Sequence, residues 1–193
     1  MTNPSALQII RDEHASLAAM LQSMRLMVQR GPDEDKRQFF DVVRAMLFYI
    51  DEFPERLHHP KESNLLFPKV VKAAPKVMGA IDKLERDHMY SEKAARDLQH
   101  LLLAWELLGS KRRAAFEEAL QKYLDFYLAH MHLEETVILP EAQRCLSTED
   151  WHVLDAAFAE NADPLSGHYP PSQEYEKLFS LIVMRAPSPI GLG

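Results

Sequence analysis

The sequence predicts an all-α protein. Its 193 residues include only 6 glycines, whereas folds rich in β-strands use more glycine in their turns. Apolar residues recur every three or four positions through four long stretches, which is the period of an amphipathic helix. The connections between these stretches are short, and short connections make neighbouring helices antiparallel. We therefore expect an up-down-up-down four-helix bundle with additional short C-terminal helices.

The first helix is expected to begin after Pro4, where Ser5 and Gln8 fit a capping box, and to end near residues 31–32, a Gly-Pro pair. The second should start around Asp33 and run through residues 54 and 60, both prolines, to Pro68. Proline lacks a backbone donor and clashes with the preceding turn. We therefore expect this helix to kink or restart at its prolines.

The third helix is expected over about residues 75–109 and the fourth over about residues 110–145. In both helices a polar residue fills a gap in the apolar stripe: His88 in the third, and His130 with Glu134 in the fourth. In the first helix His14 fills the corresponding gap. Histidines and carboxylates are therefore expected on the core side of the bundle.

After Cys145 the pattern changes. Residues 147–150 (Ser-Thr-Glu-Asp) fit the cap of a further helix, and residues 172–185 fit a last one. We divide the chain into a bundle of residues 1–146 and a helical extension of residues 147–193. We expect the extension to pack outside the functional site; the alternative is a segment that covers the pocket and controls the access of small ligands. The apolar face of the extension must be covered by the bundle or by a second copy of the chain, which makes a homodimer one expectation.

Composition excludes several classes of protein. The net charge of −7 argues against a nucleic-acid binder. A single cysteine, Cys145, excludes an internal disulfide and any CxxC motif. Neither a signal peptide nor an apolar run of the ~20 residues that a membrane span needs is visible. We expect a cytoplasmic protein with no membrane or nucleic-acid partner.

Two segments of the chain repeat each other. Residues 58–68 read HHPKESNLLFP and residues 130–140 read HMHLEETVILP. Both follow the order His, three residues, Glu, three residues, aliphatic, apolar, Pro. An isolated histidine lies on the helix before each segment, His14 before the first and His88 before the second. The chain therefore consists of two helix pairs with the same layout.

The spacing within the repeat has a chemical consequence. Residues four apart lie on one face of a helix, so each histidine and glutamate projects in the same direction. Burying these imidazoles and carboxylates together costs free energy unless each has a partner, and two bound metal ions would supply the partners. Bridging carboxylates, terminal imidazoles and an oxide or hydroxide bridge leave positions open for a small ligand. This donor set suits iron, with manganese or zinc as alternatives. The expected ligands are His14, His58, Glu62, His88, His130 and Glu134.

Three further side chains are left open. His59 stands directly before a proline that breaks the helix, so it replaces or joins its neighbour as a ligand, or does neither. Glu92, one turn after His88, is a seventh ligand, an outer partner or a solvated charge. Tyr127, one turn before His130, is a core residue that could also line the metal pocket.

From about Ile9 to Cys145 the chain resembles the hemerythrin-like family, the HHE cation-binding domains. The resemblance implies an antiparallel four-helix bundle with a non-haem di-iron centre. The family includes oxygen carriers, oxygen and iron sensors and many uncharacterised bacterial proteins. Carriers have a second third-helix histidine where this chain has Glu92, and a fourth-helix carboxylate where it has Glu135. Repeat symmetry and helix geometry favour Glu134 over Glu135, and the carboxylate-rich set is similar to the sensor-like and iron-binding branches.

We therefore expect a protein with two oxo- or hydroxo-bridged iron ions that binds or senses dioxygen, a related small molecule, or iron itself. One alternative is a di-iron enzyme that acts on peroxide or nitric oxide. A second is a structural bundle in which the metal serves stability alone. No dedicated acid, base or nucleophile is visible beyond the ligands, so the sequence does not decide whether the protein is an enzyme.

Overall fold

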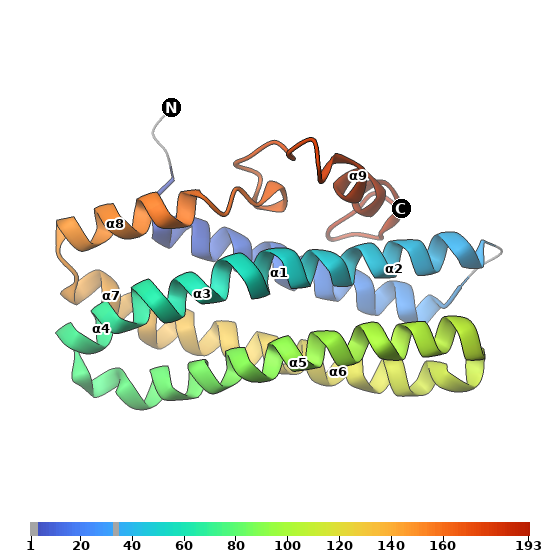
Figure 1. The fold of residues 1–193 in the computed structure, drawn as a ribbon, viewed down its shortest axis with the longest axis horizontal. Helices are drawn as coiled ribbons and strands as arrows, with labels where there is room; N and C mark the ends of the chain where they lie inside the picture. The colour runs from blue at the N-terminus through green and yellow to red at the C-terminus, as the bar shows by residue number, and fades with distance from the viewer. Residues whose placement is uncertain (1–3, 33–34) are drawn as a thin grey trace.

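The computed structural model describes residues 4–32 and 35–193. Within these ranges the chain forms helices and irregular connections and has no β-strand, which confirms the all-α prediction. Figure 1 shows long helical rods side by side along the long axis of the molecule, and the chain reverses its direction from each rod to the next. No helix in the described part of the chain has both the length and the apolar character that a membrane crossing requires.

The first rod is α1 (Ala6–Arg30). The side chain of Ser5 accepts a hydrogen bond from the backbone N–H of Gln8, as expected for an N-cap. The helix ends at Gly31, whose φ of 80° suits glycine because it has no Cβ. The second rod begins with α2 (Lys36–Ile50), capped by Asp35. The start expected around Asp33 lies outside the described residues.

The second rod continues without interruption through its prolines. After α2 come η1 (Asp51–His58), α3 (His59–Lys61), η2 (Glu62–Leu66) and α4 (Phe67–Ala73). Both η1 and η2 are π-helical, with one extra residue in the turn. The backbone N–H of His59 donates a hydrogen bond to the carbonyl oxygen of Pro54, five residues earlier. In the same way, the N–H of Phe67 donates to the carbonyl oxygen of Glu62. The expected restart is therefore replaced by a widened turn that accommodates the missing proline donor.

The third rod is α5 (Met78–Leu108), which follows the short 3₁₀ turn η3 (Pro75–Val77). After Gly109 and η4 (Ser110–Arg112) the fourth rod begins with α6 (Arg113–Leu133). This rod also contains a π-helical turn, η5 (Glu134–Ile138), before it ends with α7 (Leu139–Cys145). The 3.6-residue period of the sequence did not indicate this turn.

The core consists of two apolar clusters. One cluster includes Leu17, Phe53 and Leu98, and the other includes Ile10 and Leu84. All four rods contribute to both clusters, and each rod passes from one to the other at a stretch that carries buried histidine or glutamate. Apolar packing on both sides therefore isolates one polar layer from water, where its electrostatic interactions are stronger than in solvent.

The C-terminal extension forms two helices, α8 (Thr148–Ala159) and α9 (Glu176–Arg185), joined through η6 (Pro164–Ser166). Figure 1 shows α8 along α1 and α9 over α2. Phe158 of α8 and Phe179 and Ile182 of α9 are buried within the same chain. The expected packing on the bundle is confirmed, and the apolar face that raised the expectation of a homodimer is covered without a second copy.

Candidate metal centre

The polar layer holds two groups of side chains that converge closely enough to bind a metal ion. In each group one ligand atom from every residue lies within 4.8 Å of the others, and all the residues are buried. We call them the three-histidine group and the two-histidine group, and Glu62 belongs to both. The three-histidine group is His59, Glu62, His88 and His130; the two-histidine group is His14, His58, Glu62 and Glu134.

Glu62 lies between the two groups and directs one oxygen to each. Its Oε1 is 2.8 Å from Nε2 of His58, and its Oε2 is 3.4 Å from Nε2 of His88. The side chain is fully buried, with 0% exposure. Neither oxygen has a partner with hydrogen-bond geometry among the described residues. This is the position of a carboxylate that could bridge two ions.

Glu134 occupies the matching position on the fourth rod. Its Oε2 is 3.4 Å from Nε2 of His14 in the two-histidine group and 3.9 Å from Nε2 of His130 in the three-histidine group. It too is fully buried, and within the described chain neither oxygen makes a hydrogen bond. Two fully buried carboxylates without hydrogen-bond donors are unusual in a folded protein and point to a missing cation.

Side chains around the polar layer hold the histidine rings in their orientations. In four of the five rings Nδ1 lies within hydrogen-bond distance of a side-chain oxygen. Three of these oxygens belong to carboxylates, which can only accept, and the fourth is the hydroxyl of Ser63, which donates its own hydrogen to Glu85 at 2.9 Å, so Nδ1 carries the hydrogen in all four rings. The Nε2 lone pair then faces the interior, as in histidines that ligate metals. The pairs are His14 with Glu135 at 2.9 Å, His58 with Glu13 at 2.6 Å, His59 with Glu55 at 3.1 Å and His88 with Ser63 at 3.0 Å.

The π-helical turns lie at the ligand positions. η1 ends at His58, and η2 and η5 begin at Glu62 and Glu134. One extra residue in a turn rotates the following side chains by about 100° relative to those before it, since an α-helix turns that far per residue. The widened turns therefore set which side chains of the second and fourth rods enter the polar layer.

Without metal, the histidines differ in their affinity for protons. Burial lowers the pKa of His14, but the adjacent carboxylates of Glu134 and Glu135 outweigh it and raise that pKa to about 9. Burial lowers the pKa of His130 to about 2, against the attraction of Glu62. The two-histidine group therefore holds a proton that an incoming ion must displace, whereas His130 already offers a neutral ring.

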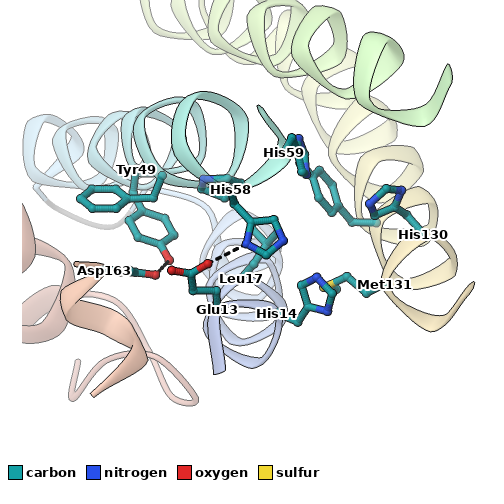
Figure 2. Close-up of a pocket in the computed structure, with 12 residues that line it drawn as sticks. Glu13, His14, Leu17, Tyr49, His58, His59, His130, Met131 and Asp163 are labelled. Atoms are coloured by element: carbon teal, nitrogen blue, oxygen red, sulfur yellow. Dashed lines mark hydrogen bonds and ion pairs between the residues drawn. The ribbon is translucent and has the colours of Figure 1, made fainter. Parts of the chain in front are cut away.

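A small cavity lies beside the two groups (Figure 2). His14 and His58 line it from the two-histidine group, and His59 and His130 line it from the other. Its volume is about 20 Å³, which admits one molecule of the size of water. Apolar and polar side chains complete the wall: Leu17, Phe53, Pro54, Met131, Tyr49, Tyr127, Glu13 and Asp163.

The structure brings together the six residues expected from the repeat, and it adds His59 to them. Glu92 lies elsewhere: its carboxylate is half exposed and pairs with Arg96 at 3.0 Å. Glu135 approaches Nδ1 of His14 on the outer side of the ring, so it contacts a candidate ligand rather than the interior of either group. Tyr127 lines the cavity and is also fully buried.

Other site residues were missed. Glu55 could have been predicted as a partner of His59, because residues four apart lie on one helix face. The only sequence signal for Glu13 is that it directly precedes His14. The expectation that the extension lies outside the site is wrong, because the loop after α8 reaches it. Asn161 donates a hydrogen bond to Glu13 at 2.9 Å, and Asp163 lines the cavity. No local pattern indicates these contacts across more than a hundred residues.

Comparison with known proteins agrees with this geometry. A family model described as the hemerythrin HHE cation binding domain matches residues 5–142. A relative from Haemophilus influenzae, named as an uncharacterized protein, is 31% identical over 109 residues, which is 56% of this chain and 60% of the relative. The match thus spans less than two thirds of the relative's length. With the family model covering all four rods, the chain belongs to the hemerythrin HHE cation-binding domain family.

Proposed function

We propose that this protein holds two iron ions side by side in its antiparallel four-helix bundle and binds dioxygen or a related small molecule there, as a carrier or a sensor. Glu62 and Glu134 would bridge the ions, together with an oxide or hydroxide. The observation that carries the proposal is the orientation of the histidines: outer oxygens hold Nδ1, which leaves Nε2 directed at two unpartnered carboxylates.

The choice of iron follows from the donor atoms. Five imidazoles and two carboxylates, with no thiolate among them, form a mixed nitrogen and oxygen set. Such a set with open positions suits iron, and manganese or zinc would be accepted with less selectivity. Iron, when bound, supplies the change of oxidation state that dioxygen chemistry needs. The bundle supplies the dry surroundings and the fixed ligand geometry.

The small ligand is proposed to bind at the two-histidine group. That group has one imidazole fewer than the other, and both of its histidines line the cavity. A volume of about 20 Å³, which admits about one water-sized molecule, favours a ligand of very few atoms over an organic substrate of ordinary size. Leu17, Phe53 and Met131 make part of the wall apolar, which favours a neutral diatomic ligand over bulk water.

Metal analysis combined with an absorption spectrum of aerobically purified protein tests the proposal. We expect about two irons per chain and near-ultraviolet charge-transfer absorption from an oxo bridge. The spectrum should change on anaerobic reduction and return when dioxygen is admitted. A protein with about one metal ion per chain, or none after reconstitution with ferrous iron, would contradict the dinuclear centre.

A di-iron enzyme acting on peroxide or nitric oxide is the second candidate. The observation that favours it is the polar part of the cavity wall, where Tyr49, Tyr127 and Glu13 place hydroxyl and carboxylate groups that reversible carriage does not need. Steady consumption of peroxide or nitric oxide by the iron-loaded protein would favour the enzyme. Unchanged stability after removal of the metal would count against a purely structural role for it.

A further inference from the structure

We propose that Tyr127 is a redox-active residue that gives up one electron to hydrogen peroxide in the cavity while its phenol proton passes to Glu55. The inference rests on the proposed iron centre, because that centre activates the peroxide. It adds a one-electron donor from the protein itself to the two metal ions.

The position of the Tyr127 hydroxyl is the first support. Its oxygen lies 3.4 Å from Nε2 of His59, the ring atom directed at the three-histidine group. The two rings are nearly parallel, at an angle of 18° and with their centroids 5.9 Å apart. Tyr127 also lines the cavity, where peroxide would bind. An electron leaving the phenol therefore crosses a single side-chain contact.

The second support is a proton acceptor at the same hydroxyl. Tyr127 donates a hydrogen bond to Oε1 of Glu55 at 2.7 Å. The other oxygen of Glu55 accepts from Ser91 at 2.9 Å and approaches Nδ1 of His59 at 3.1 Å. Loss of an electron alone would leave a buried cation, which is costly in an apolar interior. Transfer of the proton to Glu55 avoids that cost and leaves a neutral phenoxyl radical.

The chemistry balances with one ferrous ion and one peroxide. The O–O bond breaks and takes up two electrons, one from the phenol of Tyr127 and one from ferrous iron, which becomes ferric. The phenol O–H bond breaks, and its proton, held by Glu55, joins one further proton from solvent. Two molecules of water form for each peroxide consumed.

The surroundings of Tyr127 protect such a radical. The residue is fully buried, and its neighbours include Tyr123 and Phe126, with ring centroids 4.9 Å and 5.6 Å away. Tyr123 also points its hydroxyl to Oε1 of Glu55, at 3.3 Å. Burial keeps bulk solvent and large molecules away from the ring, so the radical should persist long enough to be trapped by freezing.

Tyr49 provides a matched control within the same cavity. It too is fully buried, lines the cavity and donates a hydrogen bond of 2.7 Å to a buried carboxylate, that of Asp163. The oxygen of Tyr127 lies 3.4 Å from Nε2 of the candidate ligand His59, whereas the hydroxyl of Tyr49 has the carboxylate of Asp163 as its hydrogen-bond partner within the described chain. The proposal therefore predicts that Tyr127→Phe and Tyr49→Phe, which remove one hydroxyl each, behave differently.

The experiment mixes the ferrous-loaded protein with hydrogen peroxide and freezes it for electron paramagnetic resonance. We expect a tyrosyl radical signal that changes shape when the protein is made with ring-deuterated tyrosine. It should fall to background in Tyr127→Phe, remain in Tyr49→Phe, and be missing from protein loaded with redox-inert zinc. Glu55→Gln, which keeps the phenol but removes the proton acceptor, should lower the radical yield.

Iron content, measured on every sample, separates the two proposals. Wild-type protein that does not take up iron refutes the proposed function, whereas iron-loaded protein that forms no tyrosyl radical refutes this inference alone. An unchanged signal in Tyr127→Phe, or its loss in Tyr49→Phe, also overturns the assignment. If Tyr127→Phe fails to load iron, Glu55→Gln decides, and a wild-type radical yield in that variant overturns the proposal.

Discussion

The two repeated segments, residues 58–68 on the second rod and 130–140 on the fourth, share the order of their histidine, glutamate and proline, and one of the positions where they differ bears directly on the site. In both segments a fully buried glutamate begins a π-helical turn, and a proline stands two residues after the turn ends. The residue directly after the first histidine is His59 in one segment and Met131 in the other. Both side chains line the cavity, but only His59 belongs to one of the two groups, the three-histidine group.

This difference teaches how a repeat can produce two unequal halves. The conserved layout of the segments places one carboxylate between the two groups from each side. The exchange of imidazole for thioether at this position gives one group a third histidine, whereas the other group has two. Under the proposed function, the three-histidine group would hold its ion and the two-histidine group would exchange the small ligand.

The largest effect is expected from Glu62→Ala, because Glu62 belongs to both groups. We expect loss of nearly all iron, measured per chain by elemental analysis after gel filtration. Glu134→Ala should lower mainly the occupancy of the two-histidine group. Glu135→Ala is the matched control, since Glu135 touches only the outer side of His14, and it should weaken affinity by about 10- to 100-fold. Equal losses for Glu134→Ala and Glu135→Ala would refute the assignment of Glu134 as the bridge.

The next largest effect should come from His59→Met, which places in the second-rod segment the residue that the fourth-rod segment has directly after its first histidine. It removes one imidazole from the three-histidine group, and we expect occupancy to fall from about two irons per chain to about one. The reciprocal change, Met131→His, adds a donor and should keep both irons while filling the cavity. Full iron content in His59→Met would show that His59 is not a ligand.

A smaller effect is expected from pH, and it should separate the two groups. His14 has a pKa of about 9 without metal, so at neutral pH an ion must displace its proton, whereas the lowered pKa of His130 leaves that ring neutral. In the same group burial lowers the pKa of His58, but Glu62 and Glu13 outweigh it and raise that pKa well above its usual value. Affinity of the two-histidine group should therefore rise with pH through neutrality, by about tenfold per pH unit for each proton that the ion displaces. Calorimetric titration of the apoprotein with zinc at several pH values measures both affinities. Equal pH dependence of the two binding steps would contradict this prediction.

The smallest effect is expected from Asn161→Ala, which removes the hydrogen bond from the C-terminal loop to Glu13. Glu13 in turn holds the ring of His58. A lost hydrogen bond of about 1 kcal/mol corresponds to a severalfold weaker affinity of the two-histidine group. Ser166→Ala is the control, because it removes a hydrogen bond within the same loop without touching Glu13. An equal effect of both variants would point to the fold of the loop rather than to its contact with the site.

The helices and the repeat could be predicted because both depend on short spacings within one segment. The apolar stripes follow the helical period, and His58 and Glu62 are four residues apart. The role of His59 stayed open because it depends on π-helical turns, which a 3.6-residue period does not describe. That the six residues act as ligands remains a prediction that metal analysis must test.

The outer contacts were beyond the reach of sequence reasoning for a different reason. Glu135 meets His14 across 121 positions, and Asn161 meets Glu13 across 148. Such pairs form when whole rods pack together, and no spacing of residues in the sequence indicates them. The C-terminal loop is the clearest example, since it lies beyond the residues matched by the family model and still contacts the polar layer.

The widened turns also determine which genetic changes the site tolerates. A π-helical turn is equivalent to one residue inserted into an α-helix. Deleting one residue within Glu62–Leu66 or Glu134–Ile138 would restore the regular register and rotate one side of the rod by about 100° relative to the other. Every amino acid that forms the centre would remain in the chain, yet the ligands and the apolar stripe beyond them would no longer face the interior together. The number of residues in these turns therefore constrains the candidate metal centre as strictly as the identity of any of its histidines.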